Sequence, residues 1–196
     1  AKGEKFVTLG NTVLDAVVAA GATTPEEGLA APSTRSGTDQ TVEQLIGNEA
    51  AVLGEKIVLR RLAVVKGDKF AIYLHKTNKD LPPQVGVVVG YSGDDAETAR
   101  SIAQHISFAD PQYLTRDEVP TADVEAERRI VEEISRNEGK PEAALPKIIE
   151  GRVNAFFKQV VLPEQDYARD NKQTISKVLS GAGLTIQGFV RFKVGA

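Results

Sequence analysis

The tripeptide Gly139-Lys140-Pro141 separates two long segments that both carry a helical pattern. Residues 121–137 are charged and rich in helix-favouring residues, whereas residues 142–160 place apolar side chains three or four positions apart. Glycine readily adopts the left-handed conformation that ends a helix, and proline is favoured in the first turn of the next one. The sequence therefore predicts an antiparallel helical hairpin that reverses at residues 139–141.

The second helix of this hairpin carries a nearly continuous apolar stripe, formed by Leu145, Ile148, Ile149, Val153, Phe156, Phe157 and Val160. The first helix offers few large apolar residues, namely Val124, Ile130, Val131 and Ile134, so it can cover the stripe only in part. Apolar surface that remains exposed marks contacts with other proteins. The pattern favours an interaction module over an enzyme.

Other segments predict further helices. One has Phe6, Leu9, Val13 and Val17 on one face and ends near residue 20, and two more begin at Thr24 and Thr41, where capping-box patterns occur. A fourth follows Asp94-Asp95, with Ala99, Ile102, Ala103 and Ile106 facing the core, and a short one carries Ile175, Val178 and Leu179. Capping is the favoured interpretation of Asp94-Asp95, because carboxylates stabilise helix N-termini; metal binding is the alternative.

In four places the spacing of apolar residues is typical of β-strands. Residues 56–65 and 69–75 predict a β-hairpin around the turn at 66–68, and Val85 to Tyr91 predicts a buried strand. The last strand alternates, with Leu184, Ile186, Val190, Phe192 and Val194 on one side. The predicted fold is α+β, with two small subdomains built on antiparallel sheets, residues 1–84 and 85–196. The helical hairpin, at about 121–160, protrudes from the second subdomain.

Composition excludes several classes of function. The 196 residues include no cysteine, so disulfides and thiolate metal sites are absent, and the net charge of −3 argues against binding to nucleic acid. No apolar run approaches the length of a membrane span, and neither a phosphate-binding glycine loop nor a serine nucleophile motif is present. We expect a cytoplasmic protein without cofactor or metal. The absence of methionine predicts a fragment of a longer protein.

Two positions leave alternatives open. His105 precedes Ile106 on its predicted helix, so a half-buried histidine with one hydrogen bond is the favoured interpretation, and proton transfer or partner contact is the alternative. Gly86 is unusual inside a strand unless another backbone comes close. The segment from Tyr167 to Asp170 has the composition of an ordinary loop.

Several stretches resemble the bacterial elongation factor Ts family. GKPEAALPKIIEGRVNAFFKQVVLPEQ (139–165) is similar to the family's helical hairpin, and IQGFVRFKVG (186–195) resembles its C-terminal strand. LGEKIVLRRLAVV (53–65) and DLPPQVGVVV (80–89) resemble its central strands. The resemblance covers essentially the whole sequence in order.

This resemblance implies a guanine-nucleotide exchange factor that binds GDP-bound elongation factor Tu and releases GDP by disturbing the Mg²⁺ and phosphate contacts. It implies no bond chemistry, and it implies partner contacts at an Ile-Gly pair on a strand, a His on the next helix and a loop after the hairpin. The matching positions are Val85, Gly86, His105, Ala168 and Arg169. From the match and the helix period we expect His105 and Gly86 near the surface.

The sequence departs from the family pattern in three places. Val85 replaces isoleucine, Ala168-Arg169 replaces a more apolar pair, and the family's Thr-Asp-Phe-Val motif does not occur. Without that motif we expect binding to elongation factor Tu with poor exchange. The alternative hypothesis is a scaffold without effect on nucleotides, whose hairpin mediates self-association as a possible homodimer.

Overall fold

The computed structural model describes residues 3–33, 39–78 and 82–194. The chain folds into two compact units. The first comprises residues 1–64 with 80–82, and the second comprises residues 65–79 with 83–196. The predicted boundary at 84/85 would instead assign residues 65–79 to the first subdomain.

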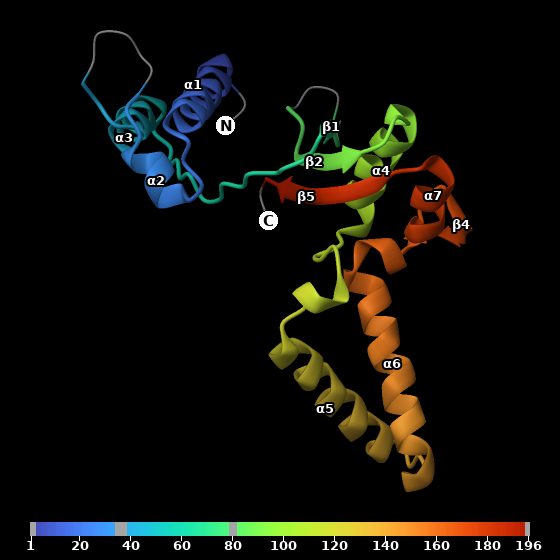
Figure 1. Cartoon of the computed structure of the whole chain (residues 1–196). Coiled ribbons are helices and arrows are strands. Elements are labelled where there is room, and N and C mark those ends of the chain that lie inside the picture. Colours follow the sequence, from blue (N-terminus) through green and yellow to red (C-terminus); the bar gives the residue numbers. More distant parts are fainter. Residues whose placement is uncertain (1–2, 34–38, 79–81, 195–196) are drawn as a thin grey trace. The chain divides into compact units, whose positions relative to one another are not determined.

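The first unit is built from three helices: α1 (Glu4–Ala20), α2 (Pro25–Ala30) and α3 (Val42–Leu53) (Figure 1). Both predicted capping boxes are confirmed, since Thr24 and Thr41 each accept a hydrogen bond from the backbone N–H three residues later. The predicted apolar face of α1 is also confirmed, because Leu9, Val13 and Val17 are buried. They pack with residues of α3 in one small core.

The predicted strand at residues 69–75 is confirmed, but its predicted hairpin partner at residues 56–65 is wrong. In the structure, residues 56–65 belong to no strand, and Ile57, Leu59 and Leu62 lie against the helical core of the first unit. The alternation of apolar and polar residues in this segment indicates that one side is covered. It does not show whether a strand or a helix covers that side. The described residues of the first unit contain helices and one isolated β-bridge, so a sheet in each subdomain is not observed there.

The second unit contains an antiparallel sheet with strand order β1-β2-β5, formed by β1 (Lys69–His75), β2 (Val85–Ser92) and β5 (Thr185–Lys193). Residue Lys69 pairs with Tyr91, and His75 pairs with Val85. One face is covered by α4 (Ala96–Ala109). The predicted core face of α4 is confirmed, because Ala99, Ile102, Ala103 and Ile106 are all fully buried.

The alternation predicted for the last strand holds only at its start. Leu184 and Ile186 are buried, but the register of β5 against β2 shifts between Gly90 and Tyr91, which leaves Gln187 as an extra residue. A bulge reverses the side to which later residues point. Phe189 therefore packs on the core, and Val194 is 72% exposed instead of inward-facing.

A small second sheet follows the hairpin in sequence. Strands β3 (Asp166–Tyr167) and β4 (Asp170–Thr174) pair antiparallel and lead into α7 (Ile175–Ala182). The segment predicted as an ordinary loop is thus a tight turn between two short strands. Two single-turn 3₁₀ helices, η1 (Arg116–Glu118) and η3 (Leu162–Glu164), flank the base of the helical hairpin.

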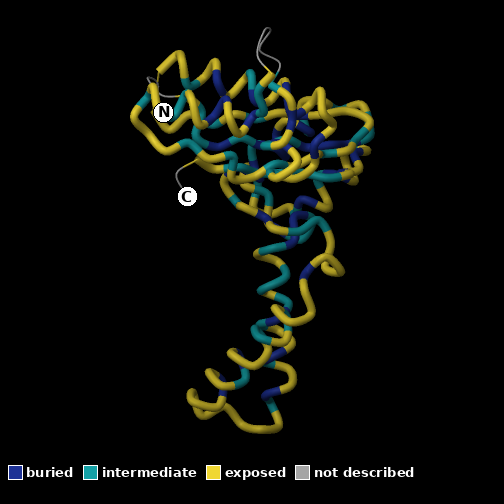
Figure 2. Tube along the Cα trace, turned by 90° about the vertical axis from the view of Figure 1, so that its left-hand side faces the viewer, coloured by how far each residue is buried: buried dark blue, intermediate teal, exposed yellow. Residues whose placement is uncertain are grey.

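The helical hairpin is confirmed. Helix α5 (Thr121–Asn137) and helix α6 (Leu145–Val160), the latter preceded by the 3₁₀ turn η2 (Glu142–Ala144), run antiparallel and contact each other (Figure 1). Gly139 has a φ of 71°, as predicted for the reversal. The shared core is small, with Val131, Leu145, Ile149 and Val153 buried. Figure 2 shows that most of the rest of the hairpin is exposed or intermediate.

Among residues 3–33, 39–78 and 82–194, none of the helices combines the length and apolar character that crossing a bilayer requires.

Candidate functional site

The β3–β4 turn is attached to α4 by the buried side chain of His105. The backbone N–H of Ala168 donates to Nδ1 of His105 over 3.1 Å. Because Nδ1 accepts this bond, the proton of the neutral ring sits on Nε2, which donates to Oε1 of Gln165 over 2.8 Å. The ring therefore joins α4 at two points to a segment that lies about 60 residues further along the chain.

Gln165 is itself fixed at its other end. Its Nε2 donates to the carbonyl oxygens of Gln159, over 2.7 Å, and Ala109, over 3.3 Å. These two acceptors orient the amide so that its oxygen faces His105. Gln165 is 6% exposed, and its network connects the ends of α4 and α6 to the turn.

A second contact ties the same turn to α4 one helical turn earlier. The hydroxyl of Ser101 hydrogen-bonds with the hydroxyl of Tyr167, and Nη1 of Arg169 donates to the same Ser101 oxygen over 3.2 Å. Ser101 and His105 are four residues apart and so lie on one face of the helix. The side chains of α4 thus hold the turn at two points, while Ala168 and Arg169 themselves remain exposed.

Burial determines the protonation of His105. Desolvation lowers the pKa of His105 below its ordinary value of 6.5, and the hydrogen bond with Gln165 opposes this shift only in part. The imidazole is neutral at neutral pH, which agrees with its acceptor role toward Ala168. Tyr167 lies beside it, with ring centroids 6.2 Å apart.

The expected surface position of His105 is wrong, because the residue is 2% exposed. It makes two hydrogen bonds instead of the single one favoured from sequence. Both partners come from a segment distant in sequence, so the helix period could not reveal them. The corresponding expectation for Gly86 is confirmed, since this residue is partly exposed.

Val85 and Gly86 form a separate part of the candidate site, at the start of β2. Val85 is buried on the side of α4, whereas Gly86 belongs to the opposite face of the sheet. A Cβ placed on Gly86 would meet only Cδ2 of Leu74, at an ordinary contact distance of 3.4 Å. In the described part of the chain, no backbone approach explains a glycine here.

The structure thus unites three of the five predicted positions. His105, Ala168 and Arg169 belong to one cluster, and no hydrogen bond links Val85 or Gly86 to it among the described residues. Sequence reasoning missed Gln165, Ser101 and Tyr167. The spacing of Ser101 and His105 on α4 was the one local signal that both residues serve a common neighbour.

The base of the hairpin is held by Arg116. Its guanidinium Nε lies 2.8 and 3.1 Å from the two carboxylate oxygens of Glu164, and its Nη1 donates to Asn154 of α6 over 3.0 Å. The same group lies 4.5 Å from the ring centroid of Phe157, also on α6. This planar clamp joins η1, η3 and α6.

Asp94 and Asp95 have structural roles. Asp95 caps α4 by accepting from the backbone N–H of Thr98, which lowers the pKa of Asp95 and confirms the capping interpretation. Asp94 pairs instead with Lys69 at 2.7 Å. No cluster of three or more potential metal ligands occurs among the residues that the structure describes.

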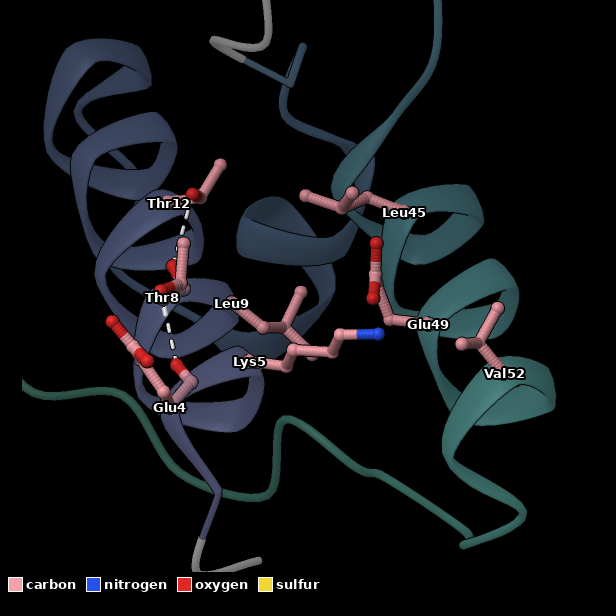
Figure 3. Close-up of a pocket in the computed structure, with 8 residues that line it drawn as sticks. All are labelled: Glu4, Lys5, Thr8, Leu9, Thr12, Leu45, Glu49 and Val52. Atoms are coloured by element: carbon pink, nitrogen blue, oxygen red, sulfur yellow. Dashed lines mark hydrogen bonds between the residues drawn. The ribbon is translucent and has the colours of Figure 1, made fainter.

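A pocket of about 410 Å³ lies between α1 and α3 in the first unit (Figure 3). Its apolar lining is Leu9, Leu45 and Val52. The hydroxyls of Thr8 and Thr12 donate to backbone carbonyls of their own helix, so they are not directed at a ligand. Figure 3 shows Lys5 reaching across the pocket toward Glu49.

The fold defines a mixed α+β protein that carries a helical hairpin. The family model described as Elongation factor TS matches residues 1–196. Proteins named Elongation factor Ts are similar over the whole chain, with 73% identity in Leifsonia xyli subsp. xyli, 67% in Clavibacter michiganensis subsp. michiganensis and 49% in Kocuria rhizophila. The chain covers 70% of the length of each of these three.

The chain therefore belongs to the elongation factor Ts family, the nucleotide exchange factors of elongation factor Tu, which are not enzymes. The resemblance inferred from the sequence is confirmed.

Proposed function

We propose that this chain binds GDP-bound elongation factor Tu and speeds the release of GDP by disturbing the Mg²⁺ and phosphate contacts of the GTPase. The family match over all 196 residues carries this proposal. An exchange factor works by coupling, because it must bind the nucleotide-free partner more tightly than the GDP-bound partner. By thermodynamic reciprocity, GDP then weakens the binding of the factor to the same extent.

We assign the contact with the GTPase to two surfaces of the second unit. One is the exposed Ala168-Arg169 turn with His105 beneath it, and the other is the start of β2 at Val85 and Gly86. The absence of an internal packing reason for glycine at position 86 supports the second surface. Position 86 then lacks a side chain because the partner comes close.

The α5–α6 hairpin is proposed as a protruding arm that grips the partner. Its small internal core and the exposure of Ile130 and Ile134, at 53% and 40%, support a protein contact along α5. The same apolar residues favour a second candidate, a homodimer formed through the hairpin. Sedimentation velocity across a hundredfold concentration range distinguishes these possibilities, because only the homodimer changes its mass with concentration.

The decisive experiment is a stopped-flow measurement of fluorescent GDP released from elongation factor Tu at increasing concentrations of this chain. We expect the release rate to rise with concentration and to reach a plateau, whose height measures exchange and whose midpoint measures affinity. Excess unlabelled GDP should weaken the binding of this chain to elongation factor Tu. A release rate equal to the spontaneous rate, with no binding by calorimetry, would contradict the proposal.

As for location, we propose the cytoplasm, the site of protein synthesis.

A further inference from the structure

We propose that Gln165 is a positioning residue for the partner-binding turn, acting through His105 to hold Ala168 and Arg169 in the geometry that the GTPase recognises. This inference rests on the function proposed above. Gln165 lies outside the five positions that the family resemblance implies.

The hydrogen bonds of Gln165 fix the orientation of its amide. Gln165 cannot flip its amide without losing both carbonyl acceptors, those of Gln159 and Ala109. Its oxygen is therefore held toward His105 and requires a proton on Nε2. With the proton there, Nδ1 is free to accept from the backbone N–H of Ala168. One amide thus selects the tautomer that anchors the turn.

Loss of the bond between Gln165 and His105 is costly. His105 and Gln165 are both almost fully buried, so water cannot readily replace either partner. A buried polar group without a partner is costly, and the ring would rotate or change its tautomer to find one. Either change removes the acceptor of Ala168. Among the described residues, the exposed pair Ala168-Arg169 would then be held to α4 only through Ser101.

Two substitutions separate positioning from simple packing. Gln165→Leu removes the acceptor of the Nε2 proton, so the tautomer is no longer selected. Gln165→Glu keeps an acceptor toward His105 but loses the two bonds that the amide donates to carbonyl oxygens. Its negative charge beside the ring favours protonated His105. A protonated ring carries a hydrogen on Nδ1 and cannot accept from Ala168. Tyr167 lies beside the ring, and the charged Arg169 bonds to Ser101, one helical turn away on α4.

The measurements are the amide exchange rate of Ala168, the nitrogen chemical shifts of His105, and the affinity for elongation factor Tu with GDP. In Gln165→Leu we expect exchange at Ala168 to be at least tenfold faster and affinity to fall at least fivefold. In Gln165→Glu, which loses both carbonyl bonds at either pH, we expect affinity to fall a further fivefold from pH 8.5 to pH 6. Gln112→Leu is the control, because the side chain of this exposed glutamine donates to the carbonyl of Asp110, and its backbone bond to Val160 is unaffected by the substitution. It should change neither quantity more than twofold.

Unchanged exchange at Ala168 in Gln165→Leu would overturn the inference, as would faster exchange with unchanged affinity. Should Gln165→Leu fail to fold, the pH profile of Gln165→Glu decides, and a flat profile overturns the inference. Should the wild-type chain not bind elongation factor Tu, the proposed function fails. The exchange rate and the nitrogen shifts then test by themselves whether Gln165 holds the turn.

Discussion

The carbonyl oxygen of Lys66 lies against Gly90 so closely that any Cβ at position 90 would overlap it. Residues 66 and 67 cross β2 at this point, and the backbone of Gly67 is also in the way. Gly86, four residues earlier on the same face of the strand, has no such neighbour. Two glycines in one strand are thus explained differently, one by packing within the chain and the other by the proposed contact with a partner.

We therefore expect alanine to lower stability at position 90 and to weaken partner binding at position 86. Gly90→Ala should lower the free energy of unfolding by about 2 kcal/mol or more, because overpacking displaces backbone. Gly86→Ala should change it by less than about 0.5 kcal/mol, the range of surface substitutions, while weakening binding to elongation factor Tu several-fold. Denaturant unfolding and GDP-release titrations measure the two quantities. Unchanged binding in Gly86→Ala would remove the start of β2 from the proposed surface.

Ser135 in α5 gives a prediction about the hairpin core. It is 0% exposed, and its hydroxyl has no hydrogen-bond partner among the described residues. A buried polar group left unpaired costs on the order of 1–3 kcal/mol, so Ser135→Ala should stabilise the hairpin by about 1 kcal/mol. Amide exchange in α5 and α6 measures this local stability. The control Ser180→Ala, at an exposed position of α7, corrects for the higher helix propensity of alanine. An equal gain in both variants would show that the buried hydroxyl costs nothing.

How far the sequence could predict this structure depends on whether the signals were local. The capping residues Thr24, Thr41 and Asp95 were recognised because a cap and its helix lie within four residues of each other. The hairpin reversal was recognised for the same reason, since Gly139 and Pro141 end one helix and start the next.

The errors came from interactions between distant segments. Alternation in residues 56–65 showed a covered side but not whether a strand or a helix covers it. The bulge at Gln187 depends on the register against β2, and one extra residue reversed the sides of the residues beyond it. The burial of His105 was missed because Gln165 and Ala168, its partners, lie about 60 residues away.

Arg116 gives a prediction about the attachment of the hairpin. Arg116→Lys keeps the charge but loses the planar contact with Phe157 and the simultaneous bonds to Glu164 and Asn154. Because the pair with Glu164 is partly exposed, we expect a loss of only about 1 kcal/mol in stability. Amide exchange should rise in the last two turns of α6 and stay unchanged in α5 near residue 137. Arg128→Lys, an exposed change on α5, is the control. Equal exchange in both variants would show that Arg116 does not clamp the hairpin.

Acid should destabilise the second unit through His105. The pKa of His105 is lowered by burial in the folded chain, so below pH 6.5 the unfolded chain binds a proton that the folded chain does not. The contribution of His105 to the free energy of unfolding is therefore fully present above its ordinary pKa. It is lost as the pH falls through that value toward the lower pKa of His105 in the folded chain. We expect the free energy of unfolding of the second unit to decrease from pH 7.5 to 5.5.

The carboxylates of Asp95 and Asp170, whose pKa values are lowered by hydrogen bonds, stay ionised over this range and add little to the change. Denaturant unfolding at both pH values measures the decrease, and His105→Gln is the comparison, because an amide keeps a polar side chain without the titration. The variant should be less stable than wild type at pH 7.5 but should lose less stability on acidification. A decrease of the same size in both proteins would show that His105 is not the group responsible.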